Sequence, residues 1–434
     1  MNEKLREPTG PGAEASVSSP SSGAPTRGAE NQMGRSTWAL ALAATVLIQT
    51  ALSFLSRLIP TLAPVLMTAS GLPFDSVGYL AAAGTAGSIL FLAAGNPLVA
   101  RLGPIRALQT GLATGICGVL MLMLPLSSTQ FASSFLVGMG YGPSVPAGSD
   151  VLLRLSPPHR RTLIFSLKQA GVPLGGVLSG LLLPRLVEAL GLRSALLITA
   201  LIPLATMLAA QRVREVIDTE RDRGQSTRIR LLLSPANIFA PFRMMRASTR
   251  LPRLTVSGVF FACGQGSLFA FLVTYLNQGL GRDLVTSGSI FAMTQITGIP
   301  GRIALGWLAD RIGSGLPVLR TLSLMSAATS AVFAITTPRW SPLALMLLSA
   351  TAGVTMSSWN GIQLAEIARE APKGKVAETT SGATLVVFLG YVLGPALFAT
   401  SVSTTHSYAA AFLVTAALSL IPILALWPSR GERR

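Results

Sequence analysis

Three basic side chains lie inside long apolar runs of this sequence: Arg57, Lys168 and Arg302. An ionisable group in such a run is costly to place in a membrane, so each marks a candidate functional site. Arg57 follows Gln49 and Ser53 at spacings that put all three on one helical face. A guanidinium on a polar stripe offers a bidentate fork for a carboxylate or sulfonate. The alternative is that Arg57 snorkels to the outer membrane interface.

The other two cations favour structural roles. Lys168 lies close enough to the cytoplasmic boundary to snorkel. A gate contact or snorkelling is therefore favoured over a second cationic contact for an anion. Arg302 precedes Gly306 by one helical turn, which predicts an inner gate in which it pairs with Glu366 or Asp310.

Carboxylates are absent from the centres of the apolar runs. Asp75, Asp150, Asp310 and Glu366 all lie near the ends of their runs. Exporters of cationic drugs commonly need a central carboxylate to exchange protons against the drug, so this pattern disfavours such an exporter. It also leaves proton coupling without an obvious carrier among the side chains.

The elements that position these residues are apolar helices. Half of the 434 residues are hydrophobic and 12% are charged, which is too apolar for an ordinary soluble protein. A bilayer core requires about 20 mostly apolar residues per helix. Since lipid cannot satisfy free backbone groups, the runs should be helices, and the predicted fold is an all-α membrane protein. The twelve predicted spans are 38–62, 74–100, 106–125, 128–153, 162–186, 193–211, 253–277, 285–309, 316–337, 341–367, 377–400 and 407–428.

The net charge of +17 is distributed as a topology signal. With the N-terminus inside, 27 of the 34 Lys and Arg residues fall on the cytoplasmic side, and three lie within spans. The other four lie on or near outer loops: Arg185, Arg193, Arg282 and Arg339. Both termini are therefore predicted to be cytoplasmic, which fits a multi-pass protein of a bacterial inner membrane, with anionic lipid contact as a secondary role. No basic stretch is interleaved with base-stacking aromatics, so no nucleic-acid partner is expected.

A charged motif lies between the eighth and ninth spans. Gly306 to Gly313 reads G-W-L-A-D-R-I-G and fits the pattern G-x-x-x-D-R-x-G. The motif at this junction resembles the major facilitator superfamily, and the resemblance covers about residues 38–428, with the general character of bacterial organic-anion and cyanate-type permeases. It implies two pseudo-symmetric six-helix halves that rock around a central cavity. The expected domains are a disordered tail 1–37, halves 38–211 and 253–428, a basic linker 212–252, and a tail 429–434.

The resemblance also implies roles for the motif. Asp310 and Arg311 would form a charge network that locks one face, while Gly306 and Gly313 would allow close helix contact. The copy in the first half is degraded: Arg101 and Gly103 remain, but Ala100 stands where the pattern has Asp. Asp150 is the natural candidate for the missing carboxylate.

The same resemblance implies that the first, fourth, seventh and tenth helices line the cavity. Arg57 would anchor the carboxylate of the substrate. Polar or aromatic side chains on the other three helices would surround it: Tyr141, Gln265, Tyr275, Trp359, Asn360 and Gln363. The alternative for each of these is helix–helix packing or a place in the aromatic belt.

The sequence does not favour an enzyme. The two histidines, His159 and His406, lie in loops on opposite sides, so no His-based metal cluster or triad is expected, and no cofactor is implied. No phosphate-binding loop of the P-loop type occurs. The sequence therefore predicts a monomeric secondary transporter that imports a small organic anion by alternating access, with proton coupling implied by the resemblance. The alternatives are an efflux transporter of a hydrophobic or neutral compound, and a membrane sensor or scaffold that does not transport.

Overall fold

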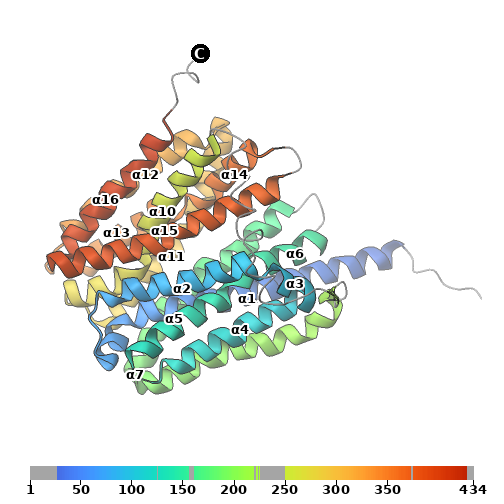
Figure 1. Cartoon of the computed structure of the whole chain (residues 1–434), viewed down its shortest axis with the longest axis horizontal. Helices are drawn as coiled ribbons and strands as arrows, with labels where there is room; N and C mark the ends of the chain where they lie inside the picture. Colours follow the sequence, from blue (N-terminus) through green and yellow to red (C-terminus); the bar gives the residue numbers. More distant parts are fainter. Residues whose placement is uncertain are drawn as a thin grey trace, which may run out of the picture.

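The computed structural model describes residues 27–124, 126–155, 161–218, 221–222, 224, 250–372 and 375–427. Within these ranges the secondary structure is helical throughout (Figure 1). The helix α1 begins at Arg27, inside the segment predicted as a disordered tail. Most of the predicted linker and all of the predicted C-terminal tail lie outside the described residues.

The first half contains six predicted spans in seven helices and one 3₁₀ turn. Its fifth and sixth spans are the two helical segments of α7, which are separated by a kink at Gly191, where the backbone is not helical (φ 76°, ψ 165°). The elements are α1 (Arg27–Ser70), α2 (Ser76–Ala94), α3 (Asn96–Leu102), α4 (Pro104–Met121), α5 (Ser127–Tyr141), η1 (Gly142–Ser144), α6 (Pro146–Leu155) and α7 (Arg161–Ile217).

The second half repeats this arrangement. Its elements are α10 (Arg250–Thr274), the short π-helix η5 (Tyr275–Gly279), α11 (Leu284–Ile312), α12 (Leu316–Ala334), α13 (Pro342–Ser357), α14 (Asn360–Glu370), α15 (Val376–Thr405) and α16 (Tyr408–Ala425). Asp283 caps α11 by accepting a hydrogen bond from the backbone N–H of Thr286. Hydrogen bonding to the side chain and then to the backbone of Thr286 lowers the pKa of the Asp283 carboxyl.

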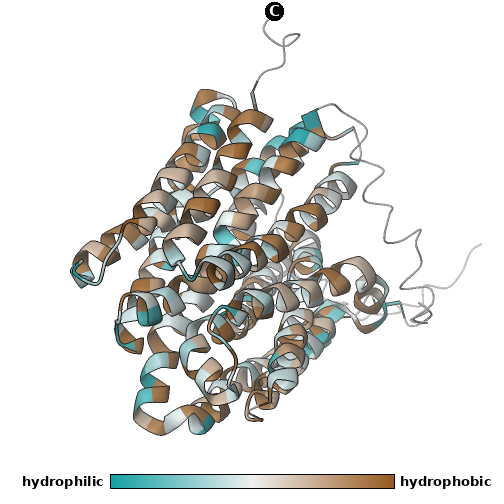
Figure 2. Cartoon of the chain, turned by 60° about the vertical axis from the view of Figure 1, so that its left-hand side comes forward, coloured by the Kyte–Doolittle hydropathy of each residue, from teal (hydrophilic) through white to brown (hydrophobic). Residues whose placement is uncertain are grey.

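The predicted all-α membrane fold, with twelve spans in two six-helix halves, is confirmed. Eight described helical segments are long and apolar enough to cross a bilayer, and one of them, Leu167–Glu215, covers two predicted spans. The remaining three predicted spans are formed by α4, by α5 with α6, and by α11. Hydrophobic residues predominate along the helices, and hydrophilic residues gather at many helix ends (Figure 2).

The fourth span of each half is broken near its middle. In the first half, α5 ends at Tyr141, and the 3₁₀ turn Gly142–Ser144 precedes α6. Proline cannot donate a hydrogen bond within a helix, and both Pro143 and Pro146 lie at this break. In the second half, α13 ends at Ser357 and α14 begins at Asn360. Both breaks free backbone carbonyls at membrane depth, where only protein groups or cavity water can satisfy them.

The two halves meet most closely at the end of the bundle opposite both termini, which we call the distal end. There α7 packs on α11 and α2 packs on α15. Gly180 and Gly288 face each other so closely that a Cβ on either would meet the backbone oxygen of the other. The hydroxyls of Tyr79 and Thr400 are 3.0 Å apart across the same boundary. The distal end is therefore closed.

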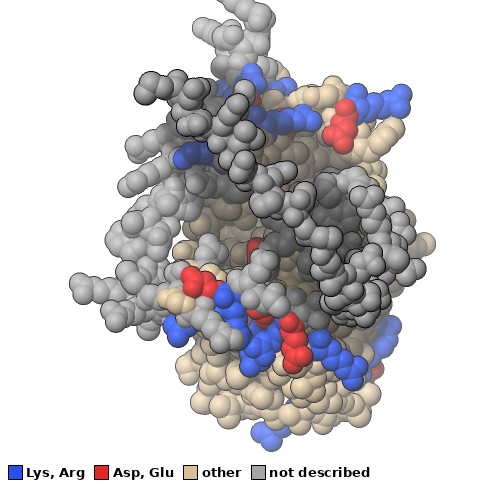
Figure 3. Space-filling model, turned by 90° about the vertical axis from the view of Figure 1, so that its right-hand side faces the viewer, with Lys and Arg blue, Asp and Glu red and all other residues tan. Residues whose placement is uncertain are grey.

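The opposite end, which we call the terminal end, carries α6 and α14. The main contacts of these two helices are with their own halves. Lys and Arg side chains gather over this end, with fewer acidic side chains among them (Figure 3). Closure at the distal end is expected in one end state of an alternating-access protein.

Candidate functional site

Arg57 lies at the boundary between the two halves, near the middle of α1. Its guanidinium carbon is 4.5 Å from the ring centre of Phe269 on α10, which is a cation–π contact. Its Nε atom is buried and has no hydrogen-bond partner in the part of the chain that the structure describes. Arg57 is also close enough to Tyr141, Tyr391 and Arg302 to interact with them electrostatically. Two cations and two phenols, one of each from either half, therefore share one polar region.

A set of hydrogen bonds extends this region. The Oε1 atom of Gln265 accepts a hydrogen bond from the Tyr391 hydroxyl at 2.8 Å and another from the Asn360 amide at 3.3 Å. In the first half, Gln49 donates from Nε2 to the Tyr141 hydroxyl at 3.3 Å. The Oε1 atom of Gln49 is buried and has no partner among the described residues. With Arg302 included, six helices from both halves thus contribute polar groups to this region.

Lys168 and Arg302 each bond to a backbone carbonyl at the break in one of the two broken helices. The Nζ atom of Lys168 donates to the carbonyl of Ser144 at 2.9 Å, at the break in the fourth span. The Nε atom of Arg302 donates to the carbonyl of Ser357 at 3.1 Å, at the break in the tenth span. A cation therefore satisfies a carbonyl that each break exposes.

The predicted partners of Arg302 were wrong. The sequence suggested an ion pair with Glu366 or Asp310, whereas Arg302 bonds to Ser357 and lies near Tyr391 and Tyr141. The physical reason is the break after Ser357, which presents a backbone acceptor closer to the centre of the bundle than the carboxylates at the helix ends. Arg302 thus lies in the same polar region as Arg57, and its predicted role in the inner gate stays a prediction.

Glycines in α15 position Tyr391. A Cβ at Gly390 would meet the backbone oxygen of Val259, and one at Gly394 would meet the backbone of Cys263, so α15 lies directly against α10. This close approach brings the Tyr391 hydroxyl to Gln265. The glycines of the eleventh span thus act through packing.

Three predicted cavity residues lie elsewhere. Tyr275 bonds through its hydroxyl to Phe333 and Thr336 in an apolar cluster that packs at the distal end. Trp359 is fully buried and stacks on a phenylalanine of α10 at a ring distance of 5.4 Å. Gln363 donates to the carbonyl of Leu254 at 2.7 Å and ties α14 to α10. Their predicted contact with a substrate remains a prediction.

The charge balance of the central region favours an anion. No described carboxylate forms an ion pair with Arg57 or Arg302. Two guanidiniums held near each other in a poorly solvated region repel, and an anion between them would offset that repulsion. The phenols and amides add hydrogen-bond donors for the same ligand.

The charged motif of the second half forms a network around Arg369. Arg369 lies 2.9 Å from Glu366 and 4.0 Å from Asp310, and it also donates to the carbonyl of Gly313 at 3.3 Å. Glu366 accepts a hydrogen bond of 2.7 Å from the backbone N–H of Gly315, just before α12 begins. These contacts join α11, α12 and α14 at the terminal end.

The other motif residues contribute differently. Arg311 stacks over Trp307, with its guanidinium carbon 5.3 Å from the ring centre. Gly313 ends α11 in the left-handed conformation with φ 78° and ψ 2°, which glycine adopts without strain. Nothing lies within 4 Å of the Cβ position of Gly306 in the described structure. Among the described residues, none makes the close helix contact expected at Gly306.

In the first half, a carboxylate that the sequence did not suggest holds the corresponding place. Asp218, at the end of α7, accepts 2.9 Å hydrogen bonds from the backbone N–H groups of Ile105 and Arg106 at the start of α4. Arg214 lies 3.7 Å from the same carboxylate. Asp218 also lies directly against Gly103, whose φ of 86° and missing side chain make room for it. Asp150 lies exposed on α6, and its predicted role as a lock stays a prediction, as does that of Arg101.

The structure has two six-helix halves, each with one broken helix, around a buried polar region at mid-bundle. This arrangement is typical of alternating-access secondary transporters. The chain belongs to the Major Facilitator Superfamily, whose family model matches residues 41–395. It is a multi-pass membrane transporter and not an enzyme.

Three relatives and one solved structure show how broad this similarity is. An uncharacterised MFS-type transporter of Mycobacterium tuberculosis is 25% identical over 86% of this chain and 82% of its own. Monocarboxylate transporter 13 of Bos taurus is 25% identical, over 80% of this chain and 79% of its own. The 4-hydroxybenzoate transporter PcaK of Pseudomonas aeruginosa is 25% identical, over 58% and 61% respectively. A crystal structure of the nucleoside transporter NupG shares the fold with a TM-score of 0.71 at 14% identity, and the match covers 89% of this chain and 98% of that one.

Proposed function

We propose that this transporter carries a small organic anion, a carboxylate, held between Arg57 of the first half and Arg302 of the second. The observation that carries the proposal is the pair of guanidiniums from opposite halves, neither of which has a carboxylate partner within the described residues. Two relatives carry names that refer to carboxylates, which supports the same substrate class.

The geometry links binding to the transport cycle. Arg57 belongs to α1 and Arg302 to α11, so an anion that contacts both joins the halves at mid-bundle. A ligand drives a conformational change only through different affinities for the two states. An anion held by both guanidiniums is bound most tightly when the halves approach, which favours closing of the terminal end.

The proposal also includes the orientation of the protein and its energy source. The basic terminal end lies on the cytoplasmic side of a bacterial inner membrane, in accord with the distribution of Lys and Arg. Transport is import, the working unit is the monomer, and protons provide the energy. The proposed domain organisation remains two six-helix halves joined by a basic linker, although α1 begins at Arg27 and α7 ends at Ile217.

A second candidate function is efflux of a neutral or hydrophobic compound. The contact between Arg57 and Phe269 supports it. The guanidinium of Arg57 already rests on Phe269, so Arg57 would be a packing group in that account. The two accounts differ in what the protein selects: the first requires a charged carboxylate, and the second tolerates its neutral analogue.

Counterflow in proteoliposomes distinguishes them. Labelled lactate, benzoate and 4-hydroxybenzoate would each be compared with the corresponding neutral amide. Exchange of a carboxylate without exchange of its amide supports the anion account. Exchange of the amide at an equal rate rejects it and supports the neutral-compound account.

A further inference from the structure

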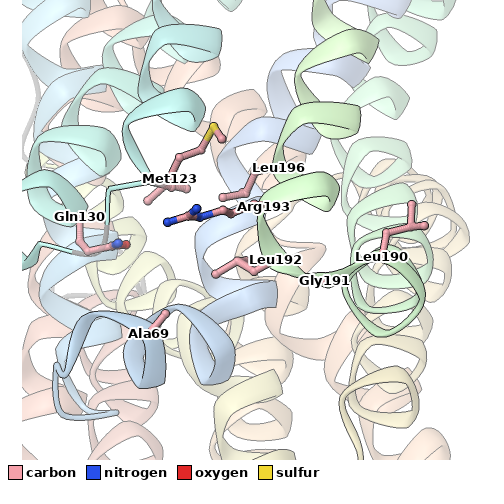
Figure 4. Close-up of a pocket in the computed structure, with 9 residues that line it drawn as sticks. Ala69, Met123, Gln130, Leu190, Gly191, Leu192, Arg193 and Leu196 are labelled. Atoms are coloured by element: carbon pink, nitrogen blue, oxygen red, sulfur yellow. The ribbon is translucent and has the colours of Figure 1, made fainter.

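A cavity lies at the distal end of the first half, away from the central region. It is bounded by the end of α1, the end of α4, the start of α5 and the bend in α7 (Figure 4). Its volume is about 400 Å³, within the range of about 300–1,000 Å³ typical of ligand pockets. The polar lining comes from Gln130 and Arg193, and the apolar walls from Leu122, Met123, Leu192 and Leu196.

Gln130 is the unusual member of this lining. Its side chain is fully buried, and neither Oε1 nor Nε2 has a hydrogen-bond partner among the described residues. Leaving an amide without hydrogen bonds in an apolar setting costs about 1–3 kcal/mol per group in proteins. The amide points into the cavity, toward the side where Arg193 lies (Figure 4). A ligand with both an acceptor and a donor would satisfy it.

Arg193 also lacks a protein partner. No described residue forms an ion pair or hydrogen bond with it. Two other arginines at the distal end are held by carbonyls: Arg282 by those of Pro338 and Trp340, and Arg185 by that of Leu181. The bend at Gly191, with its positive φ, directs the chain so that Arg193 lines the cavity. The free guanidinium is suited to an anionic oxygen group.

The rim of the cavity is apolar. Leu190 lines it and is 51% exposed, and the nearby Leu124 and Leu126 are 53% and 58% exposed. In a bilayer, exposed leucines at a helix end contact acyl chains, while an arginine at the same level faces the headgroups. The cavity therefore opens where the headgroup and the upper acyl chain of a phospholipid lie together.

We propose that this cavity binds the headgroup of a phospholipid of the leaflet at the distal end. The phosphate pairs with Arg193 and accepts from Nε2 of Gln130, and a hydroxyl or ammonium group of the headgroup donates to Oε1 of Gln130. The acyl chains lie along the exposed leucines. The bound lipid then links the start of α5 to the bend between the fifth and sixth spans.

Native mass spectrometry of the purified full-length protein tests this site. Dioleoylphosphatidylglycerol would be titrated into the wild type, Arg193→Gln, Gln130→Leu and the matched control Arg185→Gln. We expect one tight lipid in the wild type and in the control, and an apparent affinity at least about tenfold weaker in Arg193→Gln, because a charge-assisted contact is lost. Gln130→Leu should weaken binding similarly. Arg193 is exposed, so its variant keeps the test valid if Gln130→Leu does not fold.

Competition identifies the source of the phosphate. Inorganic phosphate and glycerol 3-phosphate at millimolar concentration should leave the lipid bound. Displacement by either would overturn the proposal in favour of a site for free anions. Equal lipid affinity in the wild type and Arg193→Gln would overturn it in favour of a cavity that holds water alone.

Discussion

Replacing Asp218 with alanine should release the first turn of α4. The carboxylate of Asp218 is buried and accepts hydrogen bonds from the N–H groups of Ile105 and Arg106, both at 2.9 Å. These two N–H groups lie in the first turn of α4, where no helical carbonyl can accept from them. The substitution therefore removes the acceptor of one buried and one partly buried N–H group, and it also removes the partner of Arg214.

The expected cost follows from these contacts. A hydrogen bond to a charged group contributes about 1.5–3 kcal/mol, and an anion at a helix N-terminus contributes about 0.3–1 kcal/mol more. The two bonds share one carboxylate, so their contributions are not additive. A total of about 3 kcal/mol corresponds to roughly a hundredfold increase in local opening at the start of α4.

Hydrogen exchange read by mass spectrometry measures this directly. A peptide that contains Ile105 and Arg106 should exchange roughly a hundredfold faster in Asp218→Ala, and Asp218→Asn should give an intermediate rate. Asp222→Ala is the matched control, since the exposed Asp222 contacts Ala100 through its backbone N–H and not its side chain. Unchanged protection in Asp218→Ala would refute the reasoning that this carboxylate holds the start of α4.

Three further expectations follow from the packing and the polar networks. Gly288→Val should separate the halves at the distal end and shift the population at least about tenfold toward the other end state, because overpacking costs about 1–3 kcal/mol; spin-label distances across that end would lengthen, and an unchanged distribution would contradict this. Tyr391→Phe should weaken carboxylate binding about fivefold, because Gln265 loses its 2.8 Å donor; equal affinity by calorimetry would count against the network. Glu366→Gln should lower the free energy of unfolding by about 1–3 kcal/mol, because Glu366 bonds to Arg369 and to the N–H of Gly315. Asp310→Asn should lower it by less than about 1 kcal/mol, because the Arg369–Asp310 pair is exposed and 4.0 Å long. The reverse order in unfolding curves would contradict the view that Glu366 is the stronger partner of Arg369.

The fold was predictable because hydropathy alone sets the number and length of spans in a bilayer. Helix ends were less predictable. The sixth span was expected to end near residue 211, but α7 continues to Ile217 and thereby brings Asp218 to α4. A polar residue in a supposed linker gave no sign of this contact.

The central region was predictable in part. Arg57, Tyr141, Gln265 and Asn360 stand out as polar residues on helices expected to line a cavity, and the structure brings them together. Tyr391 was missed because the eleventh span was not among those helices.

The packing that places these side chains could not be derived from spacing. Gly390 positions Tyr391 only through the close approach of α15 to α10, which the sequence does not show. Arg302 was assigned to the gate from its spacing to Gly306, and spacing along one helix does not reveal a carbonyl freed by a break in another.

Counterflow by arginine variants tests the central claim most directly. With a carboxylate that the wild type exchanges, Arg57→Gln and Arg302→Gln should each reduce exchange by at least about thirtyfold, since a buried charge-assisted contact contributes about 2 kcal/mol or more. Arg57→Lys should retain part of the activity because it keeps the charge but loses the bidentate fork. Arg320→Gln is the matched control, because Arg320 bonds to the carbonyl of Leu426 at the terminal end. Wild-type exchange and affinity in a folded Arg57→Gln protein would contradict the claim that an anion binds between the two guanidiniums.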